Sequence, residues 1–229
     1  MTSEQGAVLV TGGAGYIGSH AVLELLDRGE KVVVFDDLST GLRAMVPEGA
    51  LFEEGSVGDF DRVTEVLKKY SIDTIMHFAA LVKVEESVRE PLRYKEVNTE
   101  YTKTLLRAAG EAGVKNFIFS STCALYGNAE HNPISEDTAI APVSPYAETK
   151  QQAEEEIQAA AGEHRIKFVI LRYFNVAGTD ASGRSGYKVE GTPSHLIRGA
   201  VRALLERRPF TIYGTDYPTP DGTDRKSVV

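Results

Sequence analysis

The chain has 229 residues, 42% of them hydrophobic and 25% charged, which is the composition of a globular protein with one domain or one domain and part of a second. A net charge of −8 argues against a surface that binds nucleic acid or an anionic membrane, and no apolar run approaches the ~20 residues that cross a bilayer. A single cysteine, Cys123, excludes an internal disulfide framework and predicts a cytoplasmic location. The five histidines are scattered, so no metal site is predicted.

Along the chain, short apolar runs rich in β-branched residues alternate with segments of helical length. Strands are predicted at 7–12, 31–36, 51–55, 73–79, 116–121, 167–173 and 210–214. Helices are predicted at 59–70, at 91–113 from Pro91 to Gly113, at 145–162 from Pro145 to Gly162, and at 194–208. This alternation indicates an α/β fold with a doubly wound parallel sheet of the Rossmann type.

A glycine-rich turn, TGGAGYIGSH, directly follows the first predicted strand and opens a helix. Gly12, Gly15 and Gly18 exclude side chains where a pyrophosphate must approach the backbone, and the helix N-terminus supplies N–H groups and a positive dipole end. A glycine turn without a ligand is the alternative. Asp36, at the end of the second strand, is placed to accept hydrogen bonds from an adenosine ribose and to repel a 2′-phosphate, so the pattern favours NAD over NADP.

A candidate catalytic group lies farther along the chain. Tyr146 and Lys150 in SPYAETK are four residues apart and therefore share one helix face. The pKa of a phenol is near 10, and we expect the lysine cation together with a positive nicotinamide ring to lower it. Ser120, Ser121 and Thr122, at the end of the fifth strand, offer a hydroxyl partner where open α/β sheets bind their ligands.

These features together resemble the extended short-chain dehydrogenase/reductase family. Within it, HFAA, EESVREPL, KNFIFSSTCALYG, LRYFNVAG and YGTDYPTPDGT are similar to the UDP-glucose 4-epimerases, over residues 6–223. The resemblance implies an isomerase with tightly bound NAD, in which Tyr146 is the acid and base at the sugar 4-hydroxyl, Lys150 tunes it and contacts the nicotinamide ribose, and Thr122 bridges phenol and sugar.

The resemblance also implies the binding residues. For the cofactor these are Gly12, Gly15, Tyr16, Ile17, Gly18, Asp36, Ser56, Val57, Phe78, Ala79, Ala80, Lys150 and Phe174. For the UDP-sugar they are Thr122, Tyr146, Tyr173, Asn175, His195, Leu196 and Tyr213. Four positions depart from the family pattern, namely Ser56, Val82, Val97 and His195, and none of them removes the chemistry.

The residues after Thr122 separate related reactions. Cys123 and Ala124 stand where sugar-nucleotide dehydratases carry Asp-Glu and UDP-glucuronate decarboxylases carry Glu, so neither reaction is favoured. Oxidation and re-reduction at C4 remains, giving UDP-glucose and UDP-galactose through a 4-keto intermediate. A 4-epimerase for a UDP-pentose, a UDP-N-acetylhexosamine or a UDP-uronate stays open, as does a non-catalytic NAD-binding protein.

The resemblance sets the expected domains and partner. Residues 1–175 are expected to form the NAD-binding Rossmann-type domain and 176–223 the first part of an incomplete UDP-sugar lobe. Agreement with the family breaks off abruptly after Thr223, so 224–229 are interpreted as a non-native end and the chain as an incomplete copy. The helices near 91–112 and 146–161 are where this family forms a homodimer.

Overall fold

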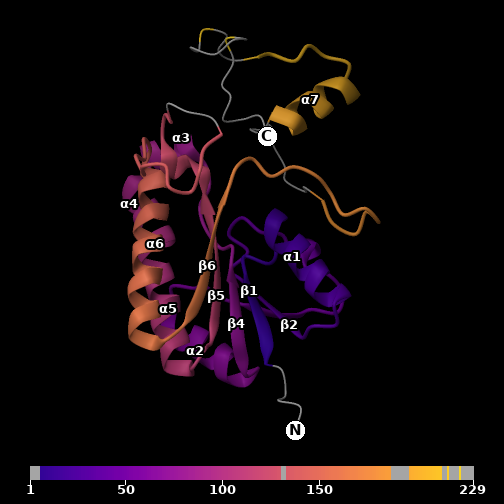
Figure 1. The fold of residues 1–229 in the computed structure, drawn as a ribbon. Coiled ribbons are helices and arrows are strands. Elements are labelled where there is room, and N and C mark those ends of the chain that lie inside the picture. Colours follow the sequence, from indigo (N-terminus) through magenta and orange to yellow (C-terminus); the bar gives the residue numbers. More distant parts are fainter. Residues whose placement is uncertain (1–5, 130–132, 187–195, 213–215, 217–221, 223–229) are drawn as a thin grey trace.

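The computed structural model describes residues 6–129, 133–186, 196–212, 216 and 222 (Figure 1). Within them a six-stranded, wholly parallel sheet has the order β3-β2-β1-β4-β5-β6. The strands are β1 (Ala7–Thr11), β2 (Val32–Asp36), β3 (Leu51–Glu54), β4 (Ile72–His77), β5 (Asn116–Thr122) and β6 (Lys167–Tyr173). The predicted doubly wound sheet is thus confirmed, and its strand order reverses between β1 and β4, where such folds bind their ligands.

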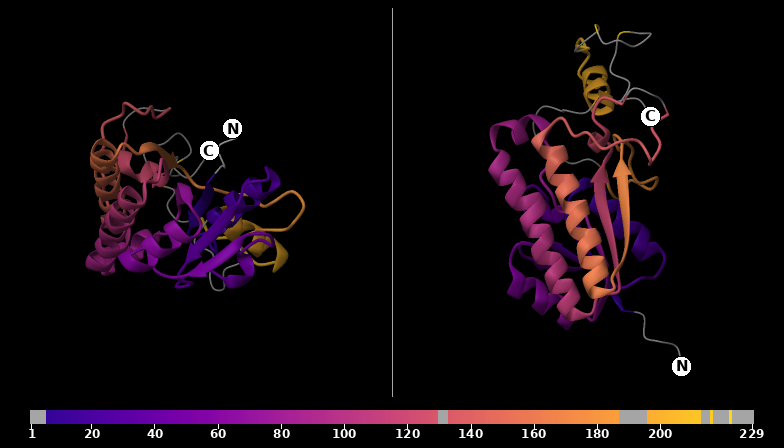
Figure 2. Two further views of the ribbon diagram at one scale, coloured as in Figure 1. Left: turned by 90° about the horizontal axis from the view of Figure 1, so that it is seen from below. Right: turned by 60° about the vertical axis from the view of Figure 1, so that its left-hand side comes forward.

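Helices cover the two faces unequally (Figures 1 and 2). On one face lie α2 (Phe60–Lys69), α4 (Pro91–Lys95), α5 (Tyr101–Ala112) and α6 (Pro145–His164), and on the other lies α1 (Tyr16–Asp27). Shorter helical segments lie between these elements, namely η1 (Arg43–Met45), α3 (Val84–Arg89), η2 (Glu96–Glu100) and η3 (Cys123–Tyr126). The helices that the sequence predicts at 59–70 and 145–162 therefore both pack on the same side of the sheet.

The core has one cluster on each face. The larger cluster joins β1, β4 and β5 to α2, α5 and α6, with Phe117, Phe119 and Leu105 fully buried. The smaller cluster joins Val10 and Val34 to Val22 of α1. The central strands β1 and β2 are nearly continuous apolar runs and are buried throughout, because both of their faces are covered.

The helix predicted at 91–113 is interrupted. A π-helical turn, η2, separates α4 from α5, and the backbone runs on through all three without leaving the helical region. Gly113 ends α5 with φ +77°, a left-handed conformation that glycine adopts without steric cost. The predicted ends are confirmed, but the π turn has no local signal in the sequence.

The predicted end of α6 at Gly162 is wrong. The helix continues to His164 and ends at Arg165, which takes the left-handed conformation with φ +57°. Gly162 stays helical because it lies in open space, where glycine weakens a helix without forcing it to stop. The start is as predicted, with Pro145 in the first turn and the Ser144 hydroxyl accepting from the Ala147 N–H.

Beyond β6 the chain leaves the sheet. The helix predicted at 194–208 appears as α7 (Leu196–Leu205), which lies beyond the carboxyl ends of the strands (Figure 1). The strand predicted at 210–214 is wrong over 210–212, which form no strand, and 213–214 lie outside the described residues. A strand needs a neighbour to share its hydrogen bonds, and the described sheet has none there, since it ends at β6.

Candidate functional site

The predicted site residues gather at the carboxyl ends of the central strands, at the end of the sheet nearest α7 (Figure 1). The glycine turn joins β1 to α1, Asp36 ends β2, and Thr122 ends β5. Tyr173 ends β6 and is the register partner of Thr122. The topology therefore brings these groups to one edge of the sheet.

The glycine turn is packed too closely to hold side chains. Gly12 has φ +70°, and a Cβ added there would lie 2.5 Å from the Ala79 nitrogen. A Cβ on Gly18 would lie 2.2 Å from the Gly12 oxygen. The glycines thus let the first turn of α1 approach β1 and the loop after β4, and they leave a backbone surface that a pyrophosphate can reach.

The positive end of α1 fits an anion. Its N-cap is Gly15, which has no side chain to accept from the helix N–H groups, and its first turn contains no Asp or Glu. Tyr16 begins the helix, and its hydroxyl donates to the Gly178 carbonyl at 2.6 Å. The predicted placement of Tyr16 and Ile17 at a pyrophosphate turn is compatible with this geometry.

Asp36 is buried, with 7% of its surface exposed. Its carboxylate accepts from the Ala14 N–H at 3.0 Å and the Leu38 N–H at 2.9 Å, so it holds the glycine turn against the end of β2. Burial raises the pKa of Asp36, and the two backbone donors oppose that rise. Each carboxylate oxygen has a second lone pair, so accepting from a ribose is compatible with these bonds.

The other predicted cofactor residues surround the same edge. Ser56 accepts from the Gly58 N–H at 3.2 Å in the turn after β3, and Val57 is buried beside it. Phe78 donates its N–H to the Thr11 carbonyl at 3.0 Å. It begins a half-buried stretch of three residues, Phe78, Ala79 and Ala80.

A buried histidine supports that loop. The Thr102 hydroxyl donates to the Asn98 carbonyl at 2.8 Å, so the Nε2–H of His77 donates to Thr102 at 3.0 Å. Nδ1 is therefore the acceptor for the Thr11 hydroxyl at 2.6 Å. Burial, with a contribution from the Lys150 cation, lowers the pKa of His77 to about 3, so the ring is neutral.

Tyr146 and Thr122 meet. The Thr122 hydroxyl lies near the phenol and acts to lower its pKa, but burial outweighs this effect and raises the pKa of Tyr146 overall. Cys123 adds to that rise. The expectation that Lys150 lowers this pKa is therefore not met by the protein groups alone.

Lys150 lies one turn after Tyr146 and is buried, with 3% of its surface exposed. Its ammonium donates to the Ser120 carbonyl at 2.9 Å and lies 4.7 Å from the centre of the Phe119 ring. Burial lowers the pKa of Lys150 to about 7, against a smaller opposing effect of the Glu154 carboxylate. This amine therefore exchanges its proton near neutral pH.

Two groups at this edge were missed by the sequence analysis. Asn98, in the π turn, accepts from the Leu81 N–H at 2.8 Å and donates to the Leu81 carbonyl at 3.0 Å. Glu154, four residues after Lys150 on α6, forms an ion pair with Arg172. The spacing of four from Tyr146 to Lys150 to Glu154 was the available signal, because it places all three on one helix face.

The predicted substrate residues other than Thr122 and Tyr146 are less enclosed. Tyr173 is half-buried, as is Phe174, a predicted cofactor residue, and burial raises the pKa of Tyr173. Asn175 is exposed, and Leu196 at the start of α7 is 49% exposed. His195 and Tyr213 lie outside the described residues.

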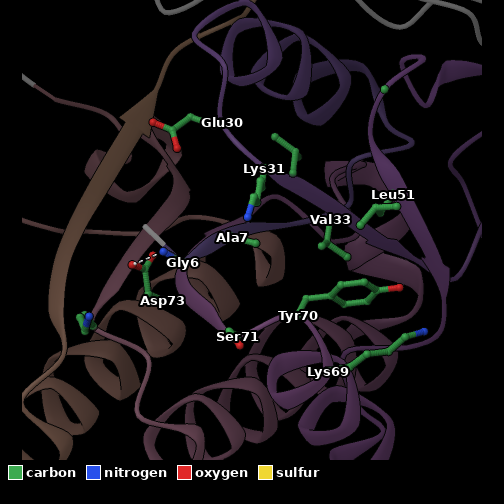
Figure 3. Close-up of a pocket in the computed structure, with 13 residues that line it drawn as sticks. Gly6, Ala7, Glu30, Lys31, Val33, Leu51, Lys69, Tyr70, Ser71 and Asp73 are labelled. Carbon is green, nitrogen blue, oxygen red and sulfur yellow. Dashed lines mark hydrogen bonds between the residues drawn. The ribbon is translucent and has the colours of Figure 1, made fainter. Parts of the chain in front are cut away.

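A hollow of about 690 Å³ lies at the opposite, amino-terminal edge of the sheet (Figure 3). Gly6, Lys31, Lys69 and Asp73 line it. The charged groups of Lys31, Lys69 and Asp73 point in different directions. The glycine turn, Tyr146 and Thr122 take no part in it. Parallel sheets bind ligands at their carboxyl edge, so this hollow is not the candidate site.

Comparisons with known proteins agree with the geometry. Residues 8–228 match the model of the NAD dependent epimerase/dehydratase family. A UDP-glucose 4-epimerase from Azospirillum brasilense is 46% identical over 97% of this chain and 64% of its own length. The chain thus spans about two thirds of the curated relatives it matches.

Solved structures are similar over the same region. A UDP-glucose 4-epimerase from Brucella ovis in complex with NAD has a TM-score of 0.90 and 41% identity, over 95% of this chain and 67% of its own. An enzyme from Stenotrophomonas maltophila, solved with NAD and formylated UDP-arabinopyranose, has a TM-score of 0.90 and 36% identity, over 96% and 68%.

Proposed function

Because the chain belongs to the NAD dependent epimerase/dehydratase family, we propose that its residues serve an NAD-dependent 4-epimerase that interconverts UDP-glucose and UDP-galactose. The observation that carries this proposal is the placement of Tyr146 next to Thr122, at the edge of the sheet where the glycine turn follows β1. An acid–base group thus stands beside a site suited to a dinucleotide.

NAD, when bound, would supply the hydride acceptor and donor at C4 and a positive ring that lowers the pKa of a nearby phenol. As the phenolate, Tyr146 would take the proton of the 4-hydroxyl and become the phenol, which would return the proton when the ketone is reduced. Thr122 would donate to the phenolate and orient the sugar oxygen. Lys150, with a pKa of about 7, would place a positive charge one helical turn from Tyr146.

The glycine turn and Asp36 would hold the cofactor. The open N-terminus of α1 would receive the pyrophosphate, and the carboxylate of Asp36 would accept from the adenosine ribose. Ser56, Val57 and the stretch 78–80 would line the adenine and nicotinamide ends, with Phe174. Tyr173, Asn175, His195, Leu196 and Tyr213 remain proposed contacts of the UDP-sugar.

Cofactor content and turnover, measured on one preparation, test the proposal. We expect the purified chain to bind NAD, and conversion of UDP-galactose to be lost in Tyr146→Phe while NAD binding is kept. Full activity of that variant would refute the assigned chemistry. NAD binding with no turnover of UDP-galactose, UDP-arabinose or UDP-N-acetylglucosamine would instead favour a non-catalytic NAD-binding role.

We also propose a homodimer formed through the outer surface of α4 and α6. Leu92 is 82% exposed, and it lines a groove between the two helices together with Pro91, Lys95, Pro145 and Glu148. Val88 of the neighbouring helix α3 is also 63% exposed, and exposed apolar side chains on adjoining elements are a feature of association surfaces. Light scattering should give twice the monomer mass, and Leu92→Glu should give the monomer; a monomeric wild-type chain would refute the dimer.

The proposed place of action is the cytoplasm. The single cysteine of the sequence, Cys123, supports a reducing compartment. Among the described residues no helix is long and apolar enough to span a bilayer. Fractionation of the source cells, followed by detection of the protein with an antibody, tests this location.

A further inference from the structure

An ion pair with a buried carboxylate includes a residue of the proposed catalytic face of α6. Glu154 is one turn beyond Lys150 on α6, and its side chain is 3% exposed. Arg172, on β6, donates from Nε to Oε1 at 3.1 Å and from Nη2 to Oε2 at 2.6 Å. This two-bond geometry fixes both the position and the orientation of the carboxylate.

Further hydrogen bonds extend the pair to β5 and η3. The Ser121 hydroxyl donates to Oε1 of Glu154, and Nη1 of Arg172 donates to the Tyr126 hydroxyl at 2.9 Å. Ser121 stands between Ser120, whose carbonyl accepts from Lys150, and Thr122, which lies near the Tyr146 phenol. The network therefore joins the elements that carry the proposed acid–base groups.

Stability alone is a weak explanation for this arrangement. A buried carboxylate and its partly buried partner lose hydration, and apolar side chains of similar volume usually stabilise a core as well or better. The carboxylate has a local electrostatic effect that an apolar residue lacks. Without Glu154, Lys150 would lose an anion that favours its charged form, and Arg172 would lose its carboxylate partner.

We propose that Glu154 and Arg172 are a positioning pair, which fixes α6 on β5 and β6 and sets the charge environment of Lys150. The inference deepens the proposed function, because the role of Lys150 beside Tyr146 belongs to that function. It concerns protein groups alone and can be tested without cofactor or sugar.

The other titratable groups around Lys150 are few among the described residues. Tyr146 precedes it on α6, and β4 contributes the neutral His77 behind Phe119. From η3, Cys123 acts on Tyr146. On the α5 side, Lys103 and Glu156 form an exposed pair that faces solvent. Glu154 is therefore the charge whose removal should act most directly on Lys150, and Arg172 acts through its pairing with Glu154.

The test is an NMR titration of the full chain with ¹³C-labelled lysine, in which loss of a signal in Lys150→Met assigns the resonance. Glu154→Gln should weaken proton binding by Lys150 about tenfold, because the favourable anion is gone. Arg172→Gln should strengthen proton binding, because the opposing cation is gone. Glu155→Gln, an exposed neighbour that accepts from Gln151, is the matched control and should leave the titration unchanged.

Opposite shifts in the two charge variants support the positioning pair. Equal titration in both variants and wild type, or shifts in one direction, would overturn it. If Glu154→Gln does not fold, Arg172→Gln decides alone, and an unchanged or weakened proton affinity of Lys150 refutes the proposal. A chain with the expected shifts but no NAD binding would refute the proposed function and leave this inference standing.

Discussion

Replacing Lys150 by methionine should stabilise the free chain near neutral pH. Burial lowers the pKa of Lys150 from 10.5 to about 7, a difference of about 3.5, which corresponds to about 5 kcal/mol of unfavourable free energy when the unfolded lysine is protonated. Methionine of similar length avoids this cost but leaves the Ser120 carbonyl without its donor, which costs about 1–2 kcal/mol. The net gain expected at pH 6–7 is about 3 kcal/mol.

The pH dependence gives the sharper result. Between pH 7 and 10.5 the unfolded chain holds a proton on Lys150 that the folded chain lacks, so stability rises with pH by up to ~1.4 kcal/mol per unit. Urea unfolding of the nucleotide-free protein at several pH values measures this slope. The variant should lose it, and Lys68→Met, at an exposed lysine on α2, should keep it. A slope equal in wild type and Lys150→Met would refute the reasoning.

The other predictions concern separate parts of the site. Gly18→Ala should abolish NAD binding, because its Cβ would lie 2.2 Å from a backbone oxygen of the same turn. The control Gly162→Ala, in open space, should leave NAD binding intact and stabilise α6 by about 0.5–1 kcal/mol. Equal NAD affinities of the two variants, measured by calorimetry, would contradict this prediction. The pKa of His77 in the folded chain is about 3, so between pH 6.5 and 3 only the unfolded state takes up this proton, and the stability of the fold should fall as the pH falls. His77→Gln should remove that part of the pH dependence. An unchanged dependence of the unfolding free energy on pH would argue against a neutral ring. Asn98→Ala should cost about 2–3 kcal/mol, since both backbone groups of Leu81 lose buried partners, and a difference below about 0.5 kcal/mol in urea unfolding would count against those bonds.

The regular part of the fold follows from local patterns. Apolar β-branched runs predict β1 and β2, because those strands are buried on both faces, and shorter apolar stretches predict β4 and β5. The glycine turn, Asp36, Thr122 and the Tyr146–Lys150 spacing could all be placed at one edge, since carboxyl ends of parallel strands meet there. The domain boundary at 175/176 and the individual site roles stay predictions.

The errors and omissions depend on contacts between distant residues. Whether 210–212 forms a strand depends on a neighbour, and α6 passes Gly162 because nothing opposes it there. The raised pKa of Tyr146 comes from burial, which its neighbours in sequence do not reveal. The bond from Asn98 to Leu81 spans 17 residues and becomes visible only when the chain is folded.

The π turn between α4 and α5 has a further consequence for the rotation of the helix. Successive residues of an α-helix are rotated by about 100° about the helix axis. The wider turn at Glu96–Glu100 therefore changes the direction in which the side chains of α4 point relative to those of α5. Asn98 can face the loop after β4 while the following turns keep Leu105 in the core. Deletion of a single residue from the π turn would leave α5 packed on the sheet. It would rotate α4 (Pro91–Lys95) about the helix axis and move Leu92 away from α6. The π turn therefore sets two orientations at once. It directs Asn98 toward the loop after β4, beside the proposed cofactor site, and it directs Leu92 toward the groove proposed for the second subunit.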